Sequence, residues 1–252
     1  MRIAVCFSGL VERLTHGRSG GRHTPGIGEP HNLFAEQMAK YKGYDHCDIF
    51  FSFWQSPITV QDVDNYLEQT LPNCMSGPYD VPAVVISGKP EIKSKYSQAN
   101  VAKVDVNFNA LQSQYAAMYR ADLLRQKYEH DGGFKYDMVF KARPDAEVVG
   151  DYNLPAWNEI LKSNSNVILL PANQHHPEEW QIGRGMYCDH WFGATSDMMT
   201  RFTTLTHRID EYVSAGCWLH PEALIWWHIT NGLNAYGAPQ YFRHLIHGRD
   251  FD

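Results

Sequence analysis

The chain alternates between short apolar runs and longer stretches in which hydrophobic positions recur at helical spacing. The runs typical of strands are Ile3–Ser8, Asp48–Trp54, Ala83–Ser87, Met138–Ala142, Val167–Leu170 and Trp191–Ala194. The stretches typical of helices are Gln61–Leu71, Asn109–His130, Ala156–Lys162, a segment capped by Thr195 or Ser196 that continues to about Val213, and one with Pro221 in its first turn. This alternation predicts an α/β fold with a mostly parallel central sheet and helices on both faces.

The longest predicted helix, Asn109–His130, carries an apolar face that we expect to be buried. Two adjacent glycines, Gly132 and Gly133, end this helix. The positions of its apolar face are Leu111, Tyr115, Met118, Tyr119 and Leu123.

Two of the predicted strands, Ile3–Ser8 and Met138–Ala142, end in polar residues. Ligands of open α/β sheets bind at the C-terminal ends of the strands, so we expect both ends to face the same crevice. Asp145 and Glu147 follow the second strand. Two carboxylates at this spacing suit a divalent cation such as Mg²⁺ or Mn²⁺, and a solvated acidic turn is the alternative.

The first strand leads into a glycine-rich loop that also contains arginines. Ser8, Gly9 and Arg13 lie within a few residues of the strand's end, where backbone N–H groups and a guanidinium suit a phosphate. A flexible surface loop is the alternative. The loop lacks the Gly-Lys-Ser/Thr of P-loop proteins and a Gly-x-Gly-x-x-Gly next to the strand, which excludes the common nucleotide-binding motifs.

Acidic residues beside aromatic ones suggest a sugar site in the second half of the chain. Asp189 precedes Trp191-Phe192-Gly193, and it is the first candidate for a general base. Glu222 is the second candidate, although the first turn of a helix favours an acid in any case. An ordinary polar turn is the alternative at both places. His247 lies in an irregular tail, Gln240–Asp252, from which it can reach back to a metal.

Composition narrows the class of protein further. With 252 residues, 44% of them hydrophobic, the chain is long enough for one large domain, and we find no internal boundary. A net charge of −6 argues against a general nucleic-acid binder. Five widely spaced cysteines, none in a Cys-x-x-Cys pair, suggest neither a zinc ribbon nor a disulfide framework. The absence of a signal peptide and of a long apolar run predicts a cytoplasmic protein without a membrane span.

The order of these motifs resembles small GT-A-type nucleotide-sugar glycosyltransferases of bacterial surface-polysaccharide loci and of viruses and phages. The residues that carry the resemblance are a first strand ending near Gly9 and Arg13, the Asp-Ile-Phe-Phe-x-x-Trp strand that starts at Asp48, the long helix, and the Tyr136-Asp-x-Val-x-Lys-x-Arg-Pro-Asp145 block. The block is the most specific of them, and the likeness extends over most of residues 1–230.

The resemblance implies a single GT-A-like, Rossmann-like domain over residues 1–252, with 240–252 as a segment that covers the active site. It implies Mn²⁺ or Mg²⁺ held by Asp145, Glu147 and a C-terminal histidine, His247 or else His244, with Glu147 replacing the second Asp of the family's Asp-x-Asp. Ser8, Gly9, Arg13, Arg143 and Asp145 would then bind the nucleotide-sugar donor, UDP- or GDP-linked first.

The expected reaction moves a sugar from this donor to a hydroxyl of a glycan or polysaccharide. Asp189 or Glu222 would act as base if the enzyme inverts, and a retaining enzyme needs no such base. Two alternatives remain: another metal-dependent phosphate-handling enzyme, such as a nucleotidyltransferase, and an inactive sugar-binding module.

Overall fold

The structure is a computed structural model that describes residues 1–10, 37, 40–41, 46–54, 83–87, 108–143, 146–149, 151–171, 189–240 and 243–246. The strands of this part are β1 (Arg2–Leu10), β2 (His46–Trp54), β3 (Ala83–Ser87), β4 (Met138–Ala142), β5 (Ala146–Val149), β6 (Val167–Pro171), β7 (Trp191–Ala194), β8 (Tyr236–Gln240) and β9 (Arg243–Ile246). The helices are α4 (Phe108–Gly132), α5 (Leu154–Ser163), α7 (Ser196–Thr203), α8 (Ile209–Ser214) and α9 (Pro221–Trp227), with a 3₁₀ turn, η2 (Thr204–His207), and a π-helical turn, η3 (His228–Gly232).

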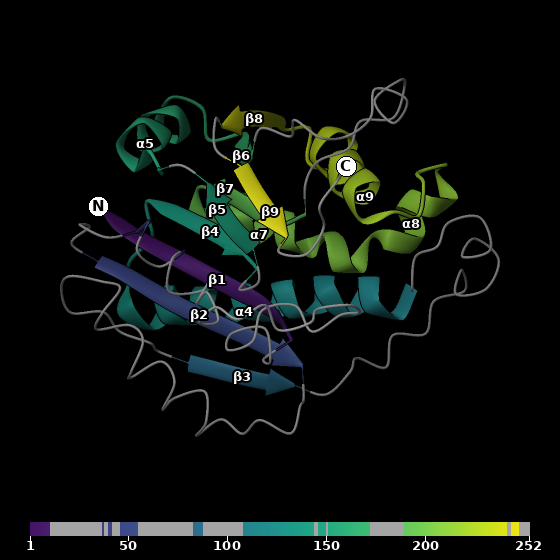
Figure 1. Ribbon diagram of the computed structural model, residues 1–252, viewed down its shortest axis with the longest axis horizontal. Coiled ribbons are helices and arrows are strands. Elements are labelled where there is room, and N and C mark those ends of the chain that lie inside the picture. The colour runs from purple at the N-terminus through teal and green to yellow at the C-terminus, as the bar shows by residue number, and fades with distance from the viewer. Residues whose placement is uncertain are drawn as a thin grey trace, which may run out of the picture.

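The large sheet is mixed and has the strand order β3-β2-β1-β4-β7-β6-β8 (Figure 1). β1 pairs in parallel with β2 and β4, β2 with β3, and β6 with β8. β7 runs antiparallel to both of its neighbours, β4 and β6. The α/β class predicted from the sequence is therefore confirmed, whereas the reversed β7 makes the sheet mixed. β4, the strand before the Arg-Pro-Asp motif, is the middle strand.

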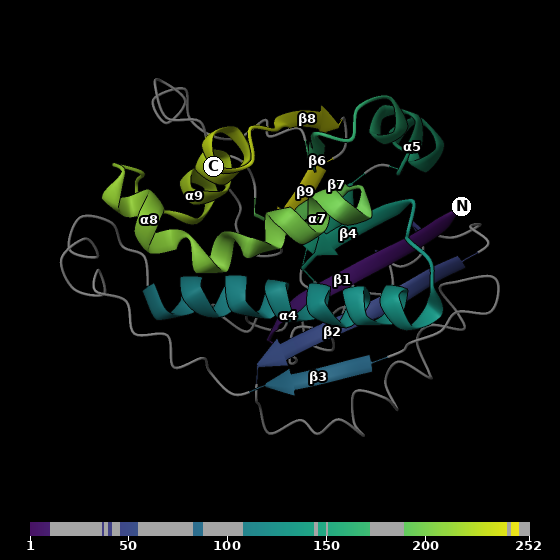
Figure 2. The ribbon, with the colours of Figure 1, turned by 180° about the vertical axis from the view of Figure 1, so that it is seen from behind.

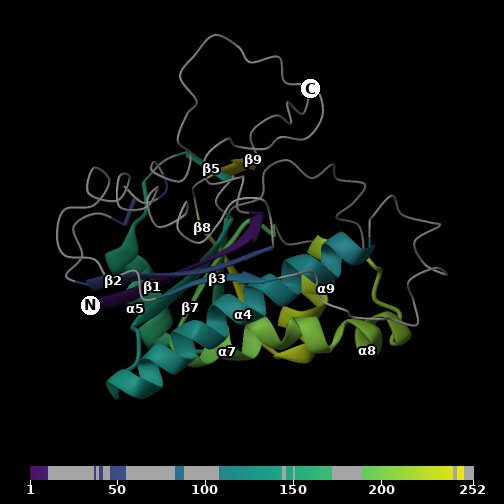
Figure 3. The ribbon, with the colours of Figure 1, turned by 90° about the horizontal axis from the view of Figure 1, so that it is seen from below.

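Apolar side chains fill both faces of this sheet because its strands alternate between them. On one face Phe140 packs against Trp157 of α5, and Phe7 belongs to the same core. On the other face Cys6 and Phe192 join the core formed by α4, α7, α8 and α9. Figure 2 shows α4 crossing β1 and β2, with α7 beside it. The smaller sheet, β5 paired with β9, stands on the opposite side of the large sheet from α4 (Figure 3).

Most predicted strands and helices appear at or near their predicted bounds, and the helix expected at 61–71 lies outside the described residues. Thr195 caps α7 as predicted, since its hydroxyl accepts from the N–H of Met198 at 3.3 Å. The continuous helix expected to Val213 is wrong, because the chain passes through η2 before α8 begins.

The buried face of α4 differs from the predicted one along its second half. Leu123, predicted to be buried, is 42% exposed. The buried positions there are taken instead by Asp122, Arg125 and Glu129, all under 3% exposed. Gly133 ends the helix as predicted, with a φ of +65° that glycine adopts without strain.

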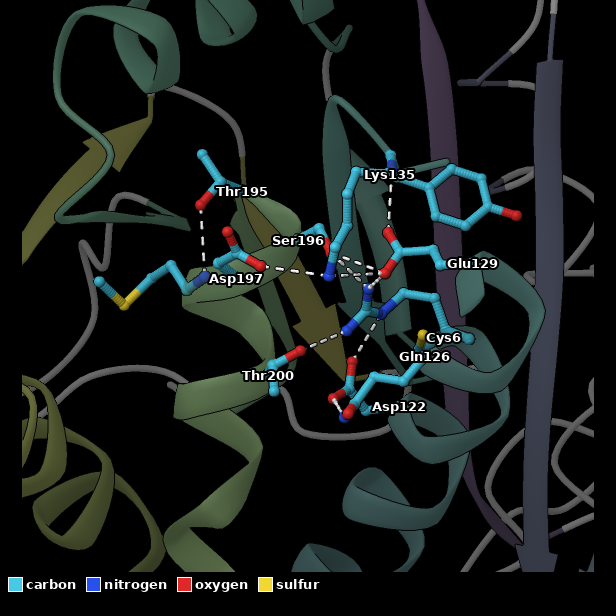
Figure 4. A network of polar contacts seen from close by, with 12 residues as sticks. Cys6, Asp122, Gln126, Glu129, Lys135, Thr195, Ser196, Asp197 and Thr200 are labelled. Carbon is cyan, nitrogen blue, oxygen red and sulfur yellow. Dashed lines mark hydrogen bonds and ion pairs between the residues drawn. The ribbon is translucent and has the colours of Figure 1, made fainter. Parts of the chain in front are cut away.

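Arg125 is the centre of a buried polar network between α4 and α7. Figure 4 shows its partners Asp122, Glu129, Ser196 and Thr200. Its Nε donates to Asp122 and its Nη1 to Glu129, both at 2.7 Å. The guanidinium also donates to the hydroxyls of Ser196 and Thr200, each at 2.7 Å. A buried ion pair with this many partners is costly to break, because removing one charge leaves the others unpaired in the core.

We expect Arg125→Ala to lower the free energy of unfolding by about 3–5 kcal/mol, because Asp122 and Glu129 would stay buried without their cation. Arg208→Ala is the matched control: that arginine pairs with Glu211 on the surface and should cost about 1 kcal/mol or less. Urea unfolding of both variants measures the difference. Equal losses would mean that the buried network does not hold α4 and α7 together.

His228 is a second buried polar group, and it links η3 to the end of α7. Its Nε2 lies 2.9 Å from the carbonyl oxygen of Phe202, which can only accept, so Nε2 carries the proton. Nδ1 then accepts from the hydroxyl of Tyr212 at 2.6 Å. Gly232 is required beside them, since a Cβ there would lie 2.0 Å from that hydroxyl. Burial lowers the pKa of His228 from 6.5 to about 4.

Because the pKa of His228 is lowered in the folded state, we expect stability to fall as the solution becomes acidic. The histidine takes up a proton near pH 6.5 in the unfolded state but only near pH 4 in the folded state. Between these values protonation favours the unfolded state, so the free energy of unfolding falls, by about 2 kcal/mol between pH 7 and pH 5. His228→Gln, which keeps one donor and one acceptor, should lack this share of the loss. Urea midpoints at the two pH values test it, and identical pH dependence in both proteins would contradict it.

Candidate functional site

The C-terminal ends of β1, β2 and β4 lie at one edge of the sheet, as the sequence predicted for the first and third of them. Phe7 of β1 is the register partner of Ala142, so Ser8 and Arg143 continue side by side from paired positions. Ser52 of β2 lies opposite Ser8, and both serines are buried. Gly9 follows with a φ of +148°, which favours glycine. This edge is the candidate site.

Asp189 reaches the same edge from the other direction, because it precedes the antiparallel β7. Its Oδ2 accepts from Nε2 of Gln114 on α4 at 2.5 Å and lies 3.6 Å from Nη1 of Arg143. Its Oδ1 lies 3.0 Å from Nε2 of His190. The backbone N–H of Arg143 also donates to the carbonyl of His190 at 3.1 Å. The side chain of Asp189 is 7% exposed, so α4, β4 and the start of β7 converge on it.

Lys141 brings a second fixed cation to Asp189. Its side chain is buried in β4, and Nζ donates to the carbonyl oxygen of Asp189 at 2.5 Å. The ammonium also lies 5.4 Å from the centre of the Phe192 ring. Lys141 and Arg143 together place two positive charges around one carboxylate.

These charges determine the ionisation of Asp189. Burial alone would raise the pKa of its carboxyl, but the contact with His190 and the charges of Arg143 and Lys141 hold that pKa well below its usual range. Asp189 is therefore a carboxylate at neutral pH, and it accepts a proton poorly.

Glu222, the other acidic candidate, stands in the first turn of α9 beside His220. Its Oε2 lies 2.5 Å from Nδ1 of His220, and the ring of Trp218 stacks on that histidine at 5.0 Å. The Glu222 side chain is 18% exposed, more than twice the value for Asp189. An aromatic face and a partly exposed carboxylate are the groups that a sugar hydroxyl site needs.

Tyr115 on α4 connects the two carboxylates. Its hydroxyl donates to the carbonyl of Pro221 at 2.8 Å, and Gln114, its neighbour, donates to Asp189. Burial raises the pKa of Tyr115 well above its usual range, and the charges of Asp189 and Glu222 raise it further. Both carboxylates thus lie within electrostatic reach of one phenol.

The predicted metal residues lie largely outside the described part. Arg13, Asp145 and His247 are among the residues that the structure does not describe, and Glu147 is described by its backbone in β5. Ala146 and Ile246, the chain neighbours of Asp145 and His247, are register partners in the β5–β9 ladder. The approach of His247 to Asp145 stays a prediction, for which carboxylate and imidazole ligands would suit Mn²⁺. Among the described residues no group of three metal-ligating side chains occurs.

The prediction of an irregular tail is wrong where the structure describes that tail. β8 continues through Gln240, and Arg243–Ile246 forms β9. Backbone hydrogen bonds to the distant β5 hold this strand, and four residues are too few to show a period that would predict such a pairing.

Three residues at the site, Gln114, Tyr115 and Lys141, were not predicted from the sequence. Lys141 carried a usable signal, since a lysine inside a buried five-residue strand needs a partner. Tyr115 fitted the apolar face of its helix, and nothing local distinguishes Gln114.

A cavity of about 630 Å³ lies at the other end of α4, away from this edge. It is lined by Glu129, Lys135, Asp197 and Thr200 among others, and so borders the Arg125 network. Its walls carry mixed charges that already pair with one another, Lys135 with Glu129 and Asp197. We therefore place the candidate site at the strand ends.

No protein-family model matches the chain, and no curated protein is significantly similar to it in sequence. Within the described residues, no helix combines the length and the apolar character that crossing a bilayer requires.

Proposed function

We propose that this chain is a GT-A-like glycosyltransferase that moves a sugar from a nucleoside-diphosphate sugar to a hydroxyl of a glycan or polysaccharide. The observation that carries the proposal is the end of the middle strand, β4. There Lys141 and Arg143 bring positive charge to the candidate site, and Asp145 follows Arg143 two residues later in the sequence. A cation-rich strand end followed by a carboxylate suits a diphosphate that shares a divalent metal with the protein.

The donor would lie along the ends of β1 and β4, against Ser8, Gly9 and Arg143. In this proposal Arg13 would be a further contact of the donor, and the segment 240–252 would cover the site. Asp145, Glu147 and His247 would hold Mn²⁺ or Mg²⁺, which offsets the charge of the departing diphosphate when it is bound. Arg143 and Lys141 add to that stabilisation through fixed positive charge.

The reaction breaks the bond between the anomeric carbon and the diphosphate oxygen, which leaves with the electron pair. The acceptor oxygen forms the new bond to that carbon and gives up its proton. For an inverting transfer, Glu222 is the better of the two predicted bases. Its carboxylate is the more exposed, whereas Asp189 is engaged by Gln114, Arg143 and His190.

Asp145→Asn should abolish Mn²⁺-dependent binding of the donor and leave the fold intact, because an amide is a weaker ligand for a hard cation. The measurement is calorimetry with UDP- and GDP-sugars, with and without Mn²⁺. Asp151→Asn, at a side chain 98% exposed, is the matched control and should bind as wild type does. Unchanged metal-dependent affinity in a folded Asp145→Asn protein would contradict the assignment, and a wild type that binds none of these donors would contradict the function.

Glu222→Gln should lower the turnover number of an inverting transfer about 10²–10⁴-fold with the donor affinity unchanged, because a general base acts only in the chemical step. Glu159→Gln, a surface change on α5, controls for loss of a charge. Assays of transfer to hydroxyl acceptors at saturating donor measure the effect. A near-normal turnover number for Glu222→Gln would remove Glu222 from the reaction.

A further inference from the structure

The contacts of Asp189 come from three separate elements, and each contributes a donor. Gln114 belongs to α4, Arg143 and Lys141 to the end of β4, and His190 to the residue before β7. Both carboxylate oxygens and the backbone carbonyl are thereby engaged. A group held in this way orients its partners more readily than it reacts.

The partners that Asp189 holds are the side chains of Arg143 and His190 at the candidate site. The side chain of Arg143 is 12% exposed and that of His190 15%, whereas the side chain of Asp189 is 7% exposed. Arg143 and His190 are thus more accessible to an incoming anion than Asp189 is.

We infer that Asp189 is a positioning residue, not the proton acceptor: it fixes Arg143 and His190 so that they bind the diphosphate of the donor. This inference rests on the proposed function and deepens it, since it assigns an anion subsite to these two residues. Gln114 completes the arrangement by holding the same carboxylate oxygen that Arg143 approaches.

A base role for Asp189 fits these observations less well. A base must accept a proton from the acceptor in the chemical step. The carboxylate is nearly buried, and its neighbours favour the ionised form strongly, so proton transfer to it is unfavourable. Glu222 meets the same requirement with fewer competing contacts.

Asp189→Asn tests the positioning role, because loss of the charge and loss of the positioning contacts change the affinity for an anion in opposite directions. Removing a negative charge 3.6 Å from Arg143 should tighten anion binding if charge alone matters. If Asp189 positions Arg143 and His190, binding should instead weaken, by roughly 10-fold as for the loss of a well-oriented charged contact.

The experiment measures dissociation constants by calorimetry for UDP, GDP and inorganic pyrophosphate, each with Mn²⁺. The proteins are wild type, Asp189→Asn, Arg143→Gln and the double variant, with thermal unfolding as the check on folding. We expect each single variant to weaken binding and the double variant to weaken it less than the product of the two, because Asp189 acts through Arg143. Asp197→Asn, at a side chain 85% exposed, is the charge-loss control and should bind as wild type does.

Three results would overturn the inference. The first is tighter or unchanged binding of the ligands by Asp189→Asn. The second is independent effects of the two substitutions on the dissociation constants. The third is a loss of turnover in Asp189→Asn with the donor affinity intact. A wild type that binds pyrophosphate in an Asp189-dependent way, but neither nucleotide, would keep the positioning role and reject the glycosyltransferase. A wild type that binds none of the three ligands would reject both.

Discussion

The buried guanidinium of Arg125 sets the register between α4 and the segment that begins at β7. Its partners lie on both helices, so α4 can slide against α7 only by leaving charges unpaired in the core. Both helices lead from this network to the candidate site. α4 carries Gln114 and Tyr115 at its other end, and α7 follows the strand that Asp189 and His190 precede. The geometry at the strand ends therefore depends on a polar contact several helical turns away.

The site itself contains two carboxylates in different environments. Asp189 is held among cations and stays ionised, whereas Glu222 pairs with one histidine beside an aromatic ring. Tyr115 lies within the field of both. Such a division suits a group-transfer enzyme, in which one region must attract a diphosphate and another must handle a neutral hydroxyl.

The sequence predicted the elements well where apolar periodicity is strong, and less well where distant partners decide. Met138–Ala142 and Trp191–Ala194 were predicted with their observed bounds, because a buried run is visible locally. The antiparallel direction of β7 is not visible locally, since the direction of a strand follows from the path of the segments that connect it to its neighbours. Leu123 was placed inside because periodicity cannot foresee that a paired Arg125 will occupy the core. β9 and Gln114 depend on partners about 100 and 75 residues away, respectively, in the sequence.

The orientation of β7 has a consequence for where functional residues stand along the chain. Parallel strands bring to the candidate site the residues at and after their C-terminal ends, as β1 does with Gly9 and β4 with Arg143. An antiparallel strand delivers the residues that come before it, so Asp189 and His190 arrive at that edge ahead of their own strand. Residues that precede one strand and residues that follow another thus meet at the same end of the sheet. Direct contacts couple the two sides: Asp189 lies 3.6 Å from Arg143, and the N–H of Arg143 donates to the carbonyl of His190, so a change in the residues that enter β7 also alters the end of β4.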